Sequence, residues 1–129
     1  MPNHVYIDKK ILPFHRTIKI SADKSLSIRT ILLASQAIGI SKISNLLESE
    51  DVLNALRVIK KLGINYKKTK KCYEIHGFGL NGYNPKNNTL INAGNSGTLG
   101  RLILSLLIKT KKKIKLIGDK SLSKRDFSR

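Results

Sequence analysis

The sequence predicts a mixed α/β (α+β) fold, because segments with strand-like and helix-like patterns alternate along most of the chain. Three segments repeat apolar residues at helical spacing, and short alternating or β-branched segments lie between them. Glycine, asparagine and proline mark the boundaries of these segments. From residue 17 onward the predicted order is β-α-β-α-β-β, followed by β-α-β.

The first predicted unit is a strand followed by a helix. Residues 17–20 alternate and are rich in β-branched side chains, which is typical of a short strand. Either Asp23 or Ser25 can cap a helix over residues 25–38, whose apolar positions form one wide face. Gly39 stands where a helix commonly ends.

A second strand and helix lead into a hairpin. Residues 42–46 are a short strand candidate, and Ser49–Asp51 opens a helix with acids in the first turn, where the helix dipole favours them. That helix ends before Gly63. The alternating segments 64–69 and 71–76 predict a β-hairpin.

The last third of the chain predicts a further β-α-β unit. Residues 77–88 hold many glycines and asparagines and predict a loop, and residues 89–92 predict a strand. A helix is expected from residues 95–98 to about residue 108, followed by a strand at 113–117. No terminal element closes this second unit, so we interpret the sequence as the N-terminal portion of a longer protein.

The bulk composition excludes some classes of protein. The formal net charge of +17 favours a polyanionic partner, but 19 lysines against 6 arginines, with many isoleucines and asparagines, also fit an A+T-rich coding sequence. Aromatic residues, which stack on bases, make up only 5%. The single Cys72 excludes an internal disulfide and indicates a reducing compartment. The histidines lack metal-ligand spacing, and no apolar run is long enough to span a membrane.

Turns suited to anions recur at the predicted strand–helix junctions. Ser21–Arg29, Ala93–Arg101 and Gly118–Arg125 each follow a strand with a small polar turn and a helix or helical turn. Six of seven residues are identical between the heptads 23–29 and 119–125. Helix N-termini carry unpaired N–H groups and a partial positive charge, and lysines and arginines add full charges. The turns therefore predict a small ligand that carries phosphate or carboxylate.

Each of these residues also has a purely structural interpretation. Ser25 can be only a helix cap, and Arg29 can be a solvated side chain. The segment 95–98 can be a plain capped turn, and it lacks the full Walker pattern. Arg101 can pair with a structural carboxylate. The recurrence of the turns at strand–helix junctions favours the functional interpretation.

These residues also resemble a known family. Residues 23–29 resemble the N-terminal signature of 5-enolpyruvylshikimate-3-phosphate synthases, also called 3-phosphoshikimate 1-carboxyvinyltransferases. Residues 45–52 look like the Asn-Leu-Leu segment of that family, and residues 92–98 with Arg101 resemble its Gly-Asn-Ser/Ala-Gly-Thr motif with the following arginine. Residues 118–125 look like the segment that ends in a ligand-binding arginine. All occur in the family's order and at similar spacing.

The resemblance implies transfer of the enolpyruvyl group of phosphoenolpyruvate to the 5-hydroxyl of shikimate 3-phosphate, with release of phosphate. It implies binding roles for several residues, with Lys24 touching both substrates. For shikimate 3-phosphate they are Lys24, Ser25 and Arg29. For phosphoenolpyruvate they are Lys24, Asn95, Gly97 and Arg125. Arg101 matches a supporting arginine, and no cofactor or metal is implied.

The family's fold implies how the chain is organised. Its members form an inside-out barrel of two lobes built from βαβαββ units, with the active site between the lobes. Residues 1–21 would then cross to the other lobe, and residues 22–129 would form part of the first lobe. The proton-handling residues of the family lie outside this chain, so we expect no catalytic residue here and no activity of the chain alone. A full-length protein would be a cytoplasmic monomer.

Other functions stay open from the sequence. The related UDP-N-acetylglucosamine enolpyruvyltransferases share the fold, although that family tends toward Lys-Asn where this chain has Lys-Ser. A basic nucleic-acid-binding module would bind with steep salt dependence. A stand-alone, non-catalytic anion binder is the remaining alternative.

Overall fold

The computed structural model describes residues 21–70 and 72–128, together with Tyr6, Lys10, Leu12, Pro13 and His15. The elements are, in order, α1 (Lys24–Gln36), β1 (Ile38–Ile43), α2 (Glu50–Lys61), β2 (Asn65–Lys68), β3 (Tyr73–Phe78), β4 (Thr89–Asn92), α3 (Gly97–Leu107), β5 (Ile114–Ile117) and the 3₁₀ turn η1 (Leu122–Lys124). The strand expected at residues 17–20 lies outside the described residues. No helix of the described part is long and apolar enough to cross a membrane.

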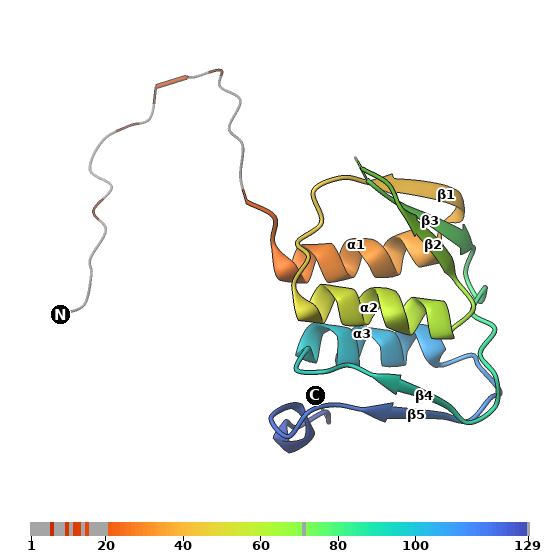
Figure 1. The fold of residues 1–129 in the computed structure, drawn as a ribbon. Coiled ribbons are helices and arrows are strands. Elements are labelled where there is room, and N and C mark those ends of the chain that lie inside the picture. The colour runs from red at the N-terminus through yellow and green to blue at the C-terminus, as the bar shows by residue number, and fades with distance from the viewer. Residues whose placement is uncertain are drawn as a thin grey trace.

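The helices lie between two sheets. β1, β3 and β2 form an antiparallel sheet in that order, with Ile38 opposite Phe78 and Asn65 opposite His76. β4 and β5 pair in parallel, with Thr89 opposite Ile114. Figure 1 shows α1, α2 and α3 stacked between these sheets, each beginning at the same end of the molecule. This mixed architecture confirms the predicted α/β fold.

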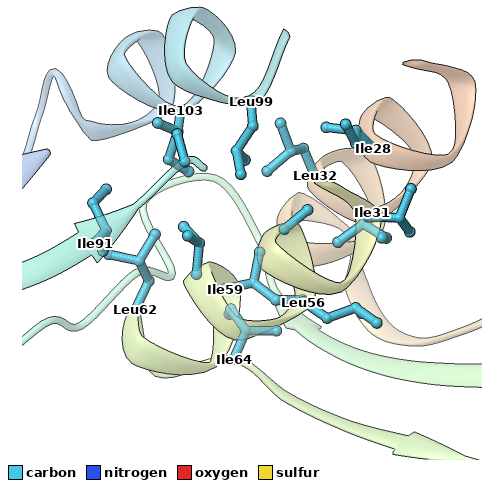
Figure 2. Close-up of a cluster of buried hydrophobic side chains, with 14 of the residues drawn as sticks. Ile28, Ile31, Leu32, Leu56, Ile59, Leu62, Ile64, Ile91, Leu99 and Ile103 are labelled. Carbon is cyan, nitrogen blue, oxygen red and sulfur yellow. The ribbon is translucent and has the colours of Figure 1, made fainter. Parts of the chain in front are cut away.

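A continuous apolar core joins the helices to both sheets. The side chains that Figure 2 labels converge from the helices, from β4 and from the segment after α2. They are almost fully buried: Ile28, Ile31, Leu32, Leu56, Ile59, Leu62, Ile64, Ile91, Leu99 and Ile103. Each such side chain contributes roughly 1.5–3 kcal/mol through its removal from water. This burial sets the relative positions of the helices.

The chain turns from α1 into β1 earlier than the sequence predicts. The expected helix 25–38 ends at Gln36, and the strand expected at 42–46 lies at Ile38–Ile43. Gly39 has a φ of +92°, but it lies within β1 instead of ending the helix. β3 packs so closely on the end of α1 that a Cβ atom at Gly77 would collide with the carbonyl oxygens of Ala34 and Ala37. The position of β1 is therefore set by its pairing with β3, which cannot be predicted from the local sequence pattern.

The other predicted elements are confirmed with small shifts at their ends. α2 begins at Glu50 with its acids in the first turn, and Gly63 follows it with a φ of +93°. The hairpin is β2–β3, although β3 continues to Phe78 into the expected loop. The strand–helix–strand unit β4-α3-β5 also forms, with Ser96 as the cap of α3.

A polar cluster ties the hairpin to the segment before α2. Lys68 Nζ lies 2.7 Å from Glu48 Oε1, and the Tyr73 hydroxyl donates to the same oxygen at 2.8 Å. The hydrogen bond from Lys68, together with that from Tyr73, lowers the pKa of Glu48. Burial, followed by the bond to Glu48, raises the pKa of Tyr73. The cluster thus prefers a charged Glu48.

Truncating the core is expected to destabilise the chain strongly. Ile59→Ala removes a fully buried side chain and leaves a cavity, so the free energy of unfolding should fall by about 2–5 kcal/mol. Ile108→Ala is the control, because Ile108 is 83% exposed, and it should change stability by less than about 0.5 kcal/mol. Urea unfolding followed by circular dichroism measures both. Equal losses would contradict the core described above.

Acid should weaken the Glu48 cluster. The pKa of Glu48 is lower in the folded chain than in the unfolded chain, where it is about 4.3. Glu48 therefore stabilises the fold at any pH above the unfolded-state pKa, and this contribution is lost as pH falls through the folded-state pKa. The Tm difference between wild type and Glu48→Gln should therefore be present at neutral pH and vanish in acid. Glu74→Gln removes an equal charge from a longer 3.5 Å pair with Lys42 and should show a smaller difference. A constant difference at all pH values would refute the role of Glu48.

Candidate functional site

The candidate site lies at the end of the molecule where α1, α2 and α3 begin. β4 and β5 also run toward this end, and η1 follows β5 there (Figure 1). Helix N-termini present unpaired N–H groups and a partial positive charge, which attract anions. The fold therefore gathers the three anion-type turns of the sequence, which are far apart along the chain, at one end.

Lys24 joins the starts of α1 and α2. Its Nζ lies 2.8 Å from Asp51 Oδ2, and the lysine side chain is 52% exposed, whereas that of Asp51 is 14% exposed. Asp51 occupies the first turn of α2, where an acid also stabilises the helix. The sequence predicted only that helix-start role, so the pairing with Lys24 is a finding of the structure.

Asp23, not Ser25, caps α1. Asp23 Oδ1 accepts a hydrogen bond from Leu26 N at 2.7 Å. Among the described residues, the Ser25 hydroxyl has no hydrogen-bond partner, which leaves it available to a ligand. Arg29 lies one turn further along α1, is exposed, and borders an apolar groove of about 400 Å³ that Leu33 and Leu102 also line.

The turn between β4 and α3 lies against α2. Gly94 has a φ of +58°, and a Cβ atom there would lie 2.5 Å from Asn54 Nδ2 and 4.0 Å from Asp51 Oδ1. The Asn92 side chain accepts from Gly94 N at 2.8 Å, and Ser96 Oγ accepts from Leu99 N at 3.1 Å. The positive φ favours glycine at position 94, and the Asn54 side chain of α2 would have to move to admit a larger residue.

The turn after β5 closes onto the start of α3. Asp119 N donates to Gly94 O at 2.9 Å, and Asn95 Nδ2 donates to Asp119 Oδ2 at 2.8 Å. Arg125 Nη2 donates to Asn95 Oδ1 at 2.9 Å, and its Nη1 lies 3.0 Å from where a Gly97 Cβ atom would stand. The hydrogen bond from Leu122 N, and then that from Asn95, lowers the pKa of Asp119. The structure thus brings Asn95, Gly97 and Arg125 together.

The repeated heptads share one local structure. Asp23 and Asp119 accept from Leu26 N and Leu122 N, both at 2.7 Å. The serine four residues on donates its hydroxyl to the carbonyl of each aspartate, at 2.6 Å in the first copy and 2.8 Å in the second. The first copy continues into α1, whereas the second stops after η1 and becomes extended at Arg125. The early stop directs Arg125 toward α3.

Arg101 holds the chain that follows Arg125. Its Nη2 donates to the Asp126 carbonyl oxygen at 3.1 Å, and its guanidinium lies 5.7 Å from the centre of the Phe127 ring. Phe127 in turn packs near Gly100 of α3. Arg101 thus contacts a backbone carbonyl and a ring, and its charge also helps to lower the pKa of the Asp126 carboxyl group, after the hydrogen bonds from Ser128.

The predicted residues therefore form two groups. Lys24, Ser25 and Arg29 lie along the first turns of α1, and Asn95, Gly97 and Arg125 lie between α3 and η1. Sequence reasoning missed the partners within each group, which are Asp51 for Lys24 and Asp119 for Asn95. The aspartate repeated in both heptads was a signal for Asp119. No group of His, Cys, Asp and Glu able to hold a metal ion occurs in the described part of the chain.

A methyl group at Gly97 is expected to displace Arg125 without unfolding the protein. The Cβ atom of Gly97→Ala would press on the flexible end of Arg125, so the bond to Asn95 should weaken while thermal stability changes little. The side-chain resonances of Arg125 and Asn95 in ¹⁵N NMR spectra measure the displacement. Gly39→Ala is strained by its φ of +92° but meets no atom within 4 Å, so it should leave the Arg125 signals in place even if stability falls. Unchanged Arg125 signals in Gly97→Ala would contradict the contact.

Comparisons with known proteins agree with the geometry. The family model for EPSP synthase (3-phosphoshikimate 1-carboxyvinyltransferase) matches residues 9–129. The 3-phosphoshikimate 1-carboxyvinyltransferase of Streptococcus pyogenes serotype M2 is 40% identical over 117 residues, which cover 91% of this chain and 27% of that protein. The enzyme of that name from Ruthia magnifica is 43% identical over 112 residues, or 87% of this chain and 26% of the relative.

Solved structures give the same result. An EPSP synthase from Acinetobacter baumannii superposes with a TM-score of 0.76 at 33% identity, and the match covers 85% of this chain and 25% of that one. The chain thus spans about a quarter of the length of the curated relatives it matches. With a family model matched over nearly its whole length, the chain belongs to the EPSP synthase (3-phosphoshikimate 1-carboxyvinyltransferase) family.

Proposed function

We propose that this chain supplies part of the site that transfers the enolpyruvyl group of phosphoenolpyruvate to the 5-hydroxyl of shikimate 3-phosphate, releasing phosphate. The reaction belongs to the shikimate pathway, toward chorismate and the aromatic amino acids. The observation that carries the proposal is that α1 and α3 begin at the same end of the molecule (Figure 1). Lys24, Ser25 and Arg29 lie in the first turns of α1, and Arg125 bonds to Asn95 just before α3. Both substrates carry phosphate and carboxylate, which these groups suit.

Each group has a definite task in this proposal. Arg29 and Ser25 hold shikimate 3-phosphate along the first turns of α1. Arg125, Asn95 and the backbone at Gly97 receive phosphoenolpyruvate at the start of α3. Lys24 lies between α1 and α2 and neutralises charge on both substrates. Bringing two anions into contact requires such neutralisation and positioning, which is how these residues lower the barrier.

The chain by itself is expected to lack turnover. The transfer needs a group that gives and takes protons, and we assign that role to the part of the relatives' length that this chain does not match. We further propose that residues 22–129 form part of one lobe, that residues 1–21 cross to the other, and that the full-length protein is a monomer. We also propose a cytoplasmic location, because a chain with one cysteine, Cys72, forms no internal disulfide and fits a reducing compartment.

Binding and turnover measurements together test the proposal. Calorimetry with shikimate 3-phosphate should show binding to the wild-type chain that is weaker than micromolar, because only part of the site is present. Arg29→Ala should weaken it by about tenfold or more, because a charge-assisted contact to phosphate is lost. Lys112→Ala removes an equal charge from the turn after α3 and should leave binding unchanged. Equal weakening by both variants would contradict the site assignment.

Phosphate release is the second measurement. With both substrates present, the chain alone should release phosphate no faster than a mixture without protein. Turnover at rates typical of enzymes, about 1–10³ s⁻¹, would show that the proton-handling groups lie within these residues and would overturn that part of the proposal.

A further inference from the structure

We propose that Asp119 is a positioning residue for Arg125 and that it acts through the side-chain amide of Asn95. The importance of this role rests on the proposed function, since it matters for catalysis only if Arg125 holds phosphoenolpyruvate. The positioning itself is a property of the free chain, so it can be tested without any substrate.

The three side chains form a directed hydrogen-bond relay. Asn95 Nδ2 donates to Asp119 Oδ2 at 2.8 Å, and Arg125 Nη2 donates to Asn95 Oδ1 at 2.9 Å. A carboxylate only accepts hydrogen bonds and a guanidinium only donates them. The amide of Asn95 therefore has one favourable orientation, with its nitrogen toward Asp119 and its oxygen toward Arg125.

Asp119 is itself fixed in place, which the relay requires. Its second oxygen, Oδ1, accepts from Leu122 N at 2.7 Å, and its backbone N donates to Gly94 O at 2.9 Å. Asp119 is thus bonded to the turns on both sides of the site. Asn95 and Arg125 are exposed, so water competes with their hydrogen bond. The expected effect of the relay is therefore on the direction of the Arg125 side chain rather than on the stability of the fold.

Asparagine at position 119 would reverse the relay. Asp119→Asn can still accept from Leu122 N through its remaining oxygen, so the cap of η1 is kept. Its new amide nitrogen would face the amide nitrogen of Asn95, and Asn95 would have to rotate by about 180° to avoid two opposed donors. The rotated Asn95 would then present a donor to the Arg125 guanidinium, which would move away.

The first heptad provides a matched control. Asp23 caps Leu26 N at 2.7 Å as Asp119 caps Leu122 N. Within the described residues, the Asp23 carboxylate has no further hydrogen-bond partner corresponding to Asn95. Asp23→Asn therefore makes the same change in chemistry and in the cap, with no relay to reverse.

The experiment uses the full 129-residue chain, ¹⁵N-labelled, without ligand. Asp119→Asn should shift the Asn95 amide and Arg125 Nε resonances, whereas Asp23→Asn should leave both at their wild-type positions. The exchanged pair, Asp119→Asn with Asn95→Asp, should restore Arg125, because the carboxylate introduced at position 95 can accept from both neighbours. Titration with phosphoenolpyruvate should then show binding about tenfold weaker in Asp119→Asn than in Asp23→Asn, which loses an equal charge.

The outcomes separate this inference from the proposed function. Unshifted Arg125 signals in Asp119→Asn, equal shifts in Asp23→Asn, or failure of the exchanged pair to restore them would overturn the positioning role. If Asp119→Asn does not fold, restoration of fold and Arg125 signals by the exchanged pair supports the role, and its absence refutes it. If phosphoenolpyruvate binds none of the proteins, the proposed function fails, while the ligand-free spectra still decide the role of Asp119.

Discussion

The shared burial of α1, α2 and α3 is the constraint on which the rest of the structure depends. Ile28 and Ile31 from α1, Leu56 and Ile59 from α2, and Ile103 from α3 belong to one apolar core. Because the helices run in the same direction through that core, their N-termini emerge together (Figure 1). Residues that are far apart along the chain are thus placed at one end of the molecule.

Two cations of the candidate site, Lys24 and Arg125, have partners in the ligand-free chain. Lys24 pairs with Asp51, and Arg125 bonds to Asn95, which is held by Asp119. Water reaches both cations, so a charged ligand can compete with their present partners. The partners therefore orient the cations at small thermodynamic cost to binding.

Helices and strands could be predicted from the sequence more accurately than the contacts between them. The caps, helix stripes and hairpin are local patterns, and they predicted α2, β4 and the β2–β3 hairpin closely. β1 was misplaced because its position depends on pairing with β3, at least 30 residues away along the chain. Both Asp23 and Ser25 are residue types that commonly cap helices, so the sequence could not distinguish them. The structure shows that Asp23 is the cap.

In the candidate site, too, the residues could be predicted from the sequence but their contacts could not. Asn95, Gly97 and Arg125 were predicted from their turns and from the family resemblance. Their mutual contacts, which join positions 30 residues apart, follow from the parallel pairing of β4 with β5. The partnership of Lys24 with Asp51 depends on how α1 packs on α2, which no spacing in the sequence reports. The strand expected at residues 17–20 stays a prediction, because these residues lie outside the described part of the chain.

The central claim is that the core gathers one anion site at the helix N-termini, and mapping of backbone amide shifts tests it most directly. The chain would be titrated with shikimate 3-phosphate and phosphoenolpyruvate together at physiological salt. We predict saturable shifts at Lys24–Ser27, at Gly94–Gly97 and at Arg125, with little change in the lysine-rich segment 109–115. Shifts concentrated in 109–115, or spread over all lysines and lost with salt, would contradict the account, because they would show attraction to net charge alone.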